Sequence, residues 1–364
     1  MIQLDGRYGE GGGALVRTAL ALSTLTGKSF EVKDIRAGRP NPGLKAQHLT
    51  AINALKEITG AETNKIFLGS TGLSFIPGRV KRGIYNIDIG TAGSITLLLQ
   101  ALILPCLFAP GKVILNVKGG TCGKWQASVD YLRQALLPQL QRFVAKIELK
   151  ILRRGYYPKG NGAISLEIVP KIRLSDFPDF NEGYEKINLT VPKIKLIEQG
   201  RLERMEGIVN ISKPLEDKKV GERIKKTAEL KLKHYQVPIE IRIDHAESLS
   251  IGGEALLWAV FSRNGKEELI NPIILASDVL VEPGKSSEQI GIELAEKLGR
   301  EIDSGAAVDV HLADQLILFM AMLPGSEIKT SEVSKHAQTN CYVSELFLPV
   351  KFECGEKVIR MKKK

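Results

Sequence analysis

The chain has 364 residues, of which 43% are hydrophobic and 25% are charged, and its formal net charge is +10. This composition excludes a disordered chain, and the length allows two domains or one large domain with an insertion. The positive charge favours an anionic partner such as nucleic acid or a phosphorylated metabolite, although a lysine-rich surface explains it equally well.

The cysteines and the apolar runs indicate where in the cell the protein is expected. Cys106, Cys122, Cys341 and Cys354 form no C-x-x-C pair. Neither a zinc site nor a disulfide framework is therefore predicted, and a reducing cytoplasm is the expected location. The longest apolar run, 95–108, is too short to span a bilayer, so we expect a buried helix there and no membrane partner.

The first elements alternate between strand and helix. Residues 2–5 predict a short strand, and a glycine-rich loop at 9–13 leads into an apolar helix at 14–26. A strand at 30–35 and a second helix at 44–58 follow. Glycine directly after the first helix is the residue expected to stop it.

The same order of small-residue loop, apolar helix, turn, strand and second helix recurs between residues 90 and 144. A third copy begins with an apolar helix at 310–323, and its strand is expected to end at His336. Copies of one supersecondary unit usually stack around a shared core. The predicted fold class is therefore α/β (α+β), with a body of repeated βαβα-type units.

A Lys/Glu-rich stretch at 183–277 separates the second copy from the third and has strand-like and helix-like runs of its own. We predict that it forms one inserted, smaller α/β domain. The main body then consists of residues 1–182 and 278–364, and its last part includes a helix at 286–302 with Ser286 or Ser287 as the N-cap.

The glycine-rich segments fit no standard nucleotide motif. Residues 9–13 fail the G-x-G-x-x-G spacing, and the Walker-like runs at 27–29 and 284–286 both lack the earlier glycine. A glycine-rich loop that opens a helix can still offer backbone N–H groups to an anion. A simple tight turn explains the same residues.

Several charged residues near these loops could contact phosphate. Glu10 could hold Mg²⁺ together with substrate phosphates, or it could be a solvated turn residue. Arg17 lies on an otherwise apolar helix, and because an unpaired buried charge is costly, it should reach an anion or a carboxylate. Arg36 and Arg39 lie in a Pro/Gly loop at a strand end, where arginine forks suit phosphate oxygens.

Among the histidines, His234 and His245 lie in the predicted insert and look incidental, and His48 is interpreted as a packed histidine. His311 opens an apolar helix, where a capping role is equally possible. His336 is the sharpest candidate, because it precedes a helical segment and follows a lysine, both of which favour a bound phosphate. Imidazole is also a capable nucleophile near neutral pH.

At these residues the sequence resembles the RNA 3'-terminal phosphate cyclase family. The similar motifs are Asp5-Gly6 with 9–13, Arg17, 35–39 with 42–44, 47–51, 119–121, Arg154 with 155–160, 311–315, and His336 with Gln338-Thr339. They cover the main body, whereas the insert resembles the family only in position and size. The family usually has three glycines where this chain has Gly160-Asn161-Gly162, and Asn tolerates the positive φ that such a turn requires.

The resemblance implies an ATP-dependent ligase that acts in RNA processing. His336 would form a covalent histidine–AMP, AMP would pass to an RNA 3'-terminal phosphate, and the adjacent 2'-OH would close a 2',3'-cyclic phosphate. The implied contacts are Gln100, His311, Leu312, Ala313, Asp314 and Gln315 for ATP, Glu10 for Mg or Mn, and Arg17, Arg36, Arg39 and Gln47 for the RNA-end phosphate or pyrophosphate.

Other readings stay open from the sequence. A non-catalytic RNA-binding relative in ribosome assembly is the main alternative, and an enolpyruvyl transferase on a similar fold is another. His336 argues against both of them, and the motif at 311–315 argues against the transferase. The expected partners are ATP and RNA 3'-phosphate ends, and the oligomeric state is left open.

Overall fold

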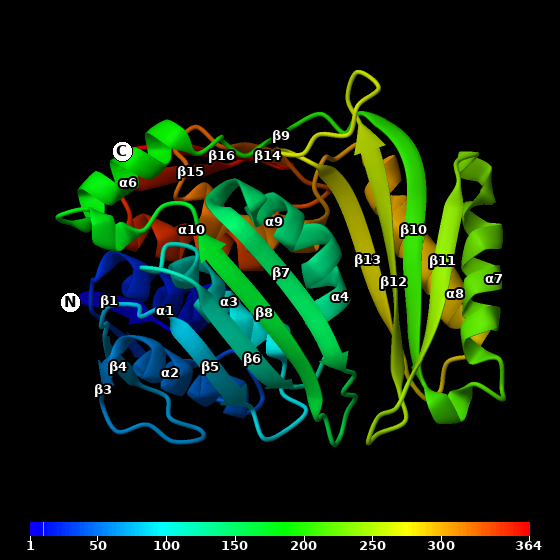
Figure 1. Ribbon diagram of the computed structural model, residues 1–364, viewed down its shortest axis with the longest axis horizontal. Helices are drawn as coiled ribbons and strands as arrows, with labels where there is room; N and C mark the ends of the chain where they lie inside the picture. The colour runs from blue at the N-terminus through cyan, green and yellow to red at the C-terminus, as the bar shows by residue number, and fades with distance from the viewer. Residues whose placement is uncertain (10) are drawn as a thin grey trace.

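A computed structural model of the chain describes residues 1–9 and 11–364. In this part of the chain the strands form four sheets of four strands each. Figure 1 shows three of the sheets, with their helices, gathered into one body, and the fourth sheet standing beside it with helices α7 and α8 on its outer face. The predicted mixed fold class is confirmed.

The first unit of the body opens the chain. Its elements are β1 (Ile2–Asp5), α1 (Ala14–Thr26), β2 (Phe30–Lys33), α2 (Ala46–Thr59), β3 (Glu62–Thr63) and β4 (Leu73–Ile76). Strands β1 and β2 pair in parallel, and β4 pairs antiparallel with both β2 and β3. Helix α1 is buried along almost its whole length and ends at Gly27, whose φ of 73° is the left-handed conformation that glycine adopts easily.

The second unit repeats this order. Its elements are β5 (Gly83–Asp88), α3 (Ile95–Cys106), β6 (Val113–Gly119), α4 (Val129–Tyr131), a π-helical turn (Leu132–Leu136), α5 (Leu137–Leu140), a 3₁₀ turn (Gln141–Phe143), β7 (Val144–Arg153) and β8 (Gly162–Pro170). The helix predicted over 129–144 is helical up to residue 143, but it runs as successive α, π and 3₁₀ turns and not as one regular α-helix. Pro138 cannot donate a backbone hydrogen bond, and the chain widens into a π-turn just before it.

The third unit closes the body. Its elements are β9 (Lys195–Leu196), α9 (Val310–Met320), β14 (Glu327–Lys329), α10 (Lys335–Phe347), β15 (Val350–Cys354) and β16 (Val358–Lys363). The strand orders β1-β2-β4-β3, β5-β6-β8-β7 and β9-β14-β16-β15 are equivalent. The predicted threefold repeat is therefore confirmed.

The fourth sheet interrupts the third unit between β9 and α9. Its layer consists of β10 (Arg201–Ser212), α7 (Val220–Leu232), β11 (Ile239–Ala246), β12 (Gly253–Ser262), β13 (Ile273–Val281) and α8 (Ser287–Asp303), with 3₁₀ turns at Lys213–Leu215 and Lys233–Tyr235. Ser286 caps α8 as predicted, because its side chain accepts from the Gln289 N–H.

The domain boundaries predicted at 183 and 277 stay a prediction, but the packing around them differs from what we expected. Helix α6 (Phe180–Thr190), which follows a 3₁₀ turn at Leu174–Asp176, contacts the body: the Tyr184 hydroxyl donates to the Ala321 carbonyl. Helix α8, expected in the body, instead packs against α7 and β13.

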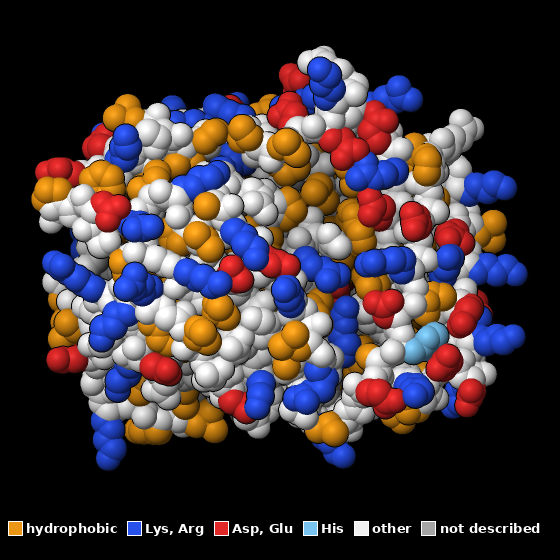
Figure 2. Space-filling view, viewed as in Figure 1, with side chains coloured by type: hydrophobic (Ala, Val, Ile, Leu, Met, Phe, Trp, Pro, Cys, Tyr) orange, Lys and Arg blue, Asp and Glu red, His pale blue; other side chains and the backbone are white. Residues whose placement is uncertain are grey.

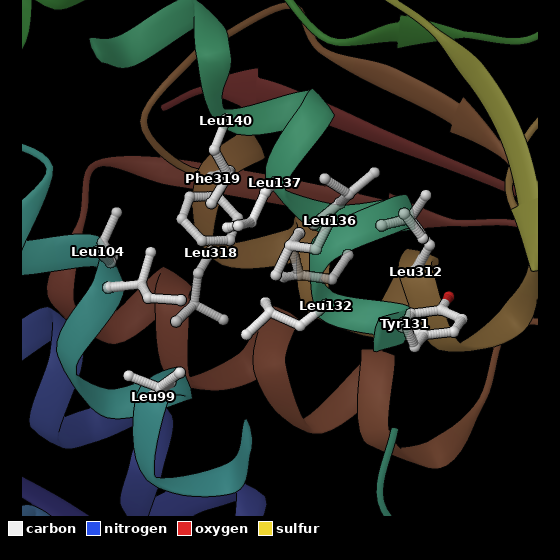
Figure 3. Packing of buried hydrophobic residues seen from close by; sticks show 14 of the residues in the cluster. Leu99, Leu104, Tyr131, Leu132, Leu136, Leu137, Leu140, Leu312, Leu318 and Phe319 are labelled. Carbon is white, nitrogen blue, oxygen red and sulfur yellow. The ribbon is translucent and has the colours of Figure 1, made fainter. Parts of the chain in front are cut away.

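The body has one continuous apolar core. Figure 3 shows where α3, the α4–α5 segment and α9 meet, with Leu99, Leu132, Leu136 and Phe319 among the buried side chains. Burial of such side chains stabilises the fold and fixes the helices that reach the cleft described below. Within residues 1–9 and 11–364, no helix is long and apolar enough to cross a membrane.

Candidate active site

A cleft with a cavity of about 1050 Å³ lies between the body and the fourth sheet. The body side is formed by helices α1, α3, α9 and α10, and the opposite side by β13 and α8. The structure brings together in this cleft six residues that the sequence analysis singled out, namely Arg17, Gln100, His311, Asp314, Gln315 and His336.

Arg17 reaches the cleft from α1 although only 8% of the residue is exposed. Its Nε donates to Gln100 Oε1 of α3 at 2.8 Å. We expected an anion or a carboxylate as its partner, whereas this contact is to a neutral amide oxygen. The bond orients the guanidinium, and its planar fork of donors suits a phosphate that enters the cleft.

Asp314 connects the helices that meet at the cleft. Its carboxylate accepts a hydrogen bond from the Ser334 hydroxyl, and its backbone carbonyl accepts from Asn340 Nδ2 at 2.9 Å. Asn340 Oδ1 in turn accepts from the Thr18 hydroxyl of α1 at 2.7 Å. Burial raises the pKa of Asp314 to about 7, although the Ser334 hydrogen bond opposes the shift.

His336 is half-buried and lies in the first turn of α10. The expectation that it ends a strand is wrong, because β14 stops at Lys329 and the Ser334 side chain caps a helix that begins at Lys335. A position at the start of a helix favours a bound anion beside His336 more than the end of a strand would. The dipole of a helix N-terminus favours negative charge beside its first turn.

His311 is exposed, lines the cleft, and meets the Tyr131 ring edge-on, with ring centroids 6.2 Å apart. It does not cap its helix. The cap is the buried Asp309, whose Oδ1 accepts from the backbone N–H of His311 and of Leu312. Asp309 was not predicted as the cap, although an Asp directly before an apolar helix is a recognisable N-cap signal.

Other residues of the predicted site lie outside the cleft lining. Leu312 and Ala313 are fully buried, so their side chains are not available to a ligand in the cleft. In the described part of the chain, Arg36, Arg39 and Gln47 are also not among the lining residues. Arg36 donates instead to carbonyl oxygens of its own loop.

His48 is buried beside the start of α1. Its Nδ1 accepts from the Lys45 N–H at 3.1 Å, so the neutral ring carries its hydrogen on Nε2. Burial, with Arg17, Arg36 and Lys45 nearby, lowers the pKa of His48 to about 3. A Cβ on Gly13 would lie 2.5 Å from His48 Nε2 and 2.8 Å from Arg17 Nη1, which shows how tightly the glycine-rich loop packs here.

The opposite wall of the cleft brings in charged residues that the sequence analysis did not select, among them Asp278, Lys297 and Arg300. Lys124, on the loop after β6, pairs with Glu282 at 3.0 Å and so connects the body to the fourth sheet. Figure 2 shows Lys and Arg side chains spread over one face of the molecule, with Asp and Glu among them over the fourth sheet. The net charge is therefore not gathered into one basic patch on this face.

The metal prediction rests on Glu10, which lies outside the described residues. Among residues 1–9 and 11–364, no group of three or more His, Cys, Asp and Glu side chains is arranged to hold a metal ion. A Mg²⁺ ion often takes only one or two carboxylates and completes its coordination with substrate phosphates and water.

Comparison with known proteins shows to which family the chain belongs. A sequence model described as "RNA 3'-terminal phosphate cyclase" matches residues 8–354. The chain belongs to the RNA 3'-terminal phosphate cyclase family. This confirms the resemblance that the motifs suggested.

Relatives named RNA 3'-terminal phosphate cyclase are similar to this chain over nearly its whole length. The protein of Archaeoglobus fulgidus is 40% identical, covering 99% of each chain. That of Methanosarcina mazei is 39% identical, covering 98% of this chain and 97% of its own, and that of Pyrococcus furiosus is 39% identical, covering 97% and 95%. The cyclase similarity therefore includes the fourth sheet as well as the body.

Proposed function

We propose that this chain is an ATP-dependent cyclase that converts an RNA 3'-terminal phosphate into a 2',3'-cyclic phosphate. The observation that carries the proposal is the position of His336. It stands at the N-terminus of α10, in the same cleft as Arg17, Gln100 and the Asp314–Gln315 pair. A nucleophile, an anion-binding helix end and a buried cation thus face one cavity.

The proposed reaction has three steps. An imidazole nitrogen of His336 attacks the α-phosphorus of ATP, and the bond to pyrophosphate breaks. The RNA 3'-phosphate then displaces the histidine and takes up AMP. Finally the adjacent 2'-OH attacks the activated phosphorus, loses its proton and expels AMP. Adenylylation is needed because a phosphate monoester is a poor electrophile, and AMP provides it with a good leaving group.

The role of the protein is chiefly positioning and charge neutralisation. We assign ATP contacts to Gln100, His311, Asp314 and Gln315, all of which line the cleft. Arg17 and the N–H groups of the first turn of α10 would stabilise negative charge on the transferring phosphate.

The remaining assignments concern residues that are not among the described residues lining the cleft. Arg36, Arg39 and Gln47 are assigned to the RNA end or to pyrophosphate, although this requires the phosphate to extend beyond the cleft lining. Glu10 is assigned to a divalent ion, Mg or Mn, which would neutralise phosphate charge when bound.

The test is covalent labelling. The protein is incubated with α-labelled ATP and Mg²⁺, and acid-labile label on the protein is expected. His336→Ala should abolish the label, whereas His234→Ala, which changes an exposed histidine on the fourth-sheet layer, should retain it. Label that persists in His336→Ala would contradict the nucleophile assignment.

The same preparation separates the other readings. Labelled protein should transfer AMP to RNA that ends in a 3'-phosphate and yield a phosphatase-resistant end, but it should not act on RNA that ends in a 3'-hydroxyl. A wild-type protein that takes no label but binds RNA would instead favour the non-catalytic relative.

A further inference from the structure

The middle of helix α10 and the end of strand β15 bring two cysteines together. The Sγ atoms of Cys341 and Cys354 are 3.6 Å apart. A disulfide bond is about 2.05 Å long, so a shift of roughly 1.5 Å would bring the sulfurs into bonding distance. Neither thiol has a role in the proposed reaction, and the pair was not predicted because the cysteines are 13 positions apart with no motif between them.

The contact between the helix and the strand is held independently of the sulfurs. Glu345 of α10 accepts hydrogen bonds from the Phe352 N–H and from Lys351 Nζ, both at 2.7 Å. Strand β15 also pairs antiparallel with β16, with Cys354 opposite Ile359. The backbones on both sides are therefore fixed, and the sulfurs remain neighbours while the fold persists.

The two thiols differ in access and in ionisation. Cys341 is only 5% exposed, whereas Cys354 is exposed. The hydrogen bond from the Cys341 thiol lowers the pKa of Cys354, and nearby Lys351 acts in the same direction. The same contact, together with burial, raises the pKa of Cys341. An accessible thiol with a lowered pKa beside a second thiol is the usual arrangement of an attacking and a resolving cysteine.

We propose that Cys341 and Cys354 are a thiol modification site, which a small-molecule disulfide oxidises to an intramolecular disulfide. The Cys354 thiolate attacks one sulfur of the oxidant, forms a mixed disulfide and releases one reduced thiol. Cys341 loses its proton, attacks the Cys354 sulfur and releases the second reduced thiol. The protein gives up two electrons and two protons, and the oxidant takes up both electrons.

The bond would act on the helix that carries His336. Cys341 and His336 lie on the same helix, α10. Asn340, adjacent to Cys341, accepts a hydrogen bond from the Thr18 hydroxyl and donates one to the Asp314 carbonyl. Oxidation therefore joins α10 covalently to the β15–β16 hairpin and limits its separation from the hairpin on unfolding. A cross-link of this kind stabilises mainly by restricting the unfolded chain.

The test is peptide mapping without reduction. Protein purified with a reductant is freed of it, incubated with oxidised glutathione, unfolded in urea, alkylated with iodoacetamide so that buried thiols also react, and digested with trypsin. Cleavage after Lys335, Lys351 and Lys357 places the cysteines in separate peptides, 336–351 and 352–357. The expected product is these two peptides joined, with the loss of two hydrogens, while Cys106 and Cys122 remain alkylated.

Two results of the mapping would overturn the proposal. One is alkylation of both Cys341 and Cys354 after oxidation, and the other is glutathione that remains on Cys354 without passing to Cys341. Neither result depends on catalysis, so a failure here leaves the cyclase proposal untouched, and the reverse also holds.

Thermal unfolding provides a second measurement. Oxidation should raise the Tm of the wild type by several degrees and leave the Tm of Cys354→Ser unchanged. Cys354→Ser changes an exposed side chain, so the variant is expected to fold. An equal rise in both proteins would overturn the assignment, because the stabilising bond would then lie elsewhere.

Discussion

At the scale of single residues, Asp314 has a protonation state that depends strongly on the fold. Its pKa is about 7 in the folded protein against an ordinary value of 3.8, and the main cause is burial. The folded state therefore binds this proton more tightly than the unfolded state does. Between pH 4 and pH 7 its contribution to the free energy of unfolding falls as the pH rises.

The first prediction concerns Asp314→Asn, which resembles the protonated carboxyl and does not titrate. Relative to the wild type, the variant should gain stability as the pH rises from 5 to 7, by up to about 1.4 kcal/mol per pH unit. Urea unfolding of both proteins at pH 5, 6, 7 and 8 measures the difference, in which other titrating groups cancel. A difference that stays constant with pH would show that Asp314 keeps an ordinary pKa.

Gly13 is a second residue at which a small change should have a large effect, because one added carbon atom would be too close to its neighbours. An added Cβ would lie 2.5 Å from His48 Nε2 and 2.8 Å from Arg17 Nη1, closer than such contacts normally are. His48 is held by its bond to the Lys45 N–H, so the added carbon must displace the ring or the loop together with the side chain of Arg17. The bond from Arg17 to Gln100 would then be disturbed.

The second prediction is that Gly13→Ala lowers the rate of protein labelling by ATP by at least tenfold, because a 1 Å displacement of a positioning group costs this much or more. Gly72→Ala is the matched control. A Cβ there has only an ordinary contact at 3.8 Å with the Val32 carbonyl. Equal labelling rates in the two variants would show that the position of Arg17 does not affect the labelling step.

At the scale of elements, α9 is fixed by its N-cap. Asp309 Oδ1 accepts from the N–H groups of His311 and Leu312 and from the Tyr131 hydroxyl, and Oδ2 accepts from the Ala276 N–H at 3.0 Å. One fully buried carboxylate thus joins the start of α9 to α4 and to β13.

The third prediction compares Asp309→Ala with Tyr131→Phe. The alanine variant leaves several buried donors without an acceptor and should lose about 3–5 kcal/mol of unfolding free energy. The phenylalanine variant removes a single hydroxyl and should lose about 1 kcal/mol. Denaturant unfolding gives both values, and similar losses in the two variants would show that the cap contributes little.

The elements that the sequence predicted well are those whose signals are local. Helix α1 was predicted with its observed bounds because its apolar residues follow the helical period and Gly27 stops it. The turn at Gly160-Asn161 also holds, since Asn161 has the positive φ, 62°, that we expected an asparagine to tolerate.

The elements that were mispredicted depend on contacts between distant residues. The first turn of α10 has no apolar period, and its start is set by Ser334, whose hydroxyl also bonds to Asp314, 20 residues earlier. The site itself could not be assembled from spacing. Residues 17, 100, 314 and 336 meet only because repeated units stack around one core. The sequence context singled out Arg17 and His336, whereas the family resemblance identified Gln100 and Asp314.

At the scale of the whole molecule, a buried polar cluster joins the body to the fourth sheet. Arg154, just after β7, donates to Asp130 of α4 and to Glu254 of β12, with 2.9 Å to the latter. Asn210 of β10 also donates to Asp130, at 3.1 Å. Both carboxylates are fully buried, so Arg154 is the cation that makes their burial tolerable.

Within this cluster the two acids are not equivalent. Burial and the nearby Asp130 raise the pKa of Glu254 well above its ordinary range, although Arg154 opposes the shift. This shift favours the neutral form of Glu254, whereas Asp130 pairs with two arginines, Arg154 and Arg133. The cluster therefore holds Asp130 between two cations, with Glu254 beside Arg154.

The last prediction follows from this difference between Glu254 and Asp130. Glu254→Gln replaces an acid whose raised pKa favours its neutral form with a neutral amide of the same shape, and should change the free energy of unfolding by less than about 1 kcal/mol. Arg154→Met removes the buried cation and leaves Asp130 with only the partly exposed Arg133, so it should cost about 3 kcal/mol. Urea unfolding at pH 7 measures both. A large loss in Glu254→Gln would mean that Glu254 is ionised and shares Arg154 with Asp130. A small loss in Arg154→Met would mean that the fourth sheet is held to the body mainly by other contacts, such as the Lys124–Glu282 pair and the bond from the Ser128 N–H to Asp278.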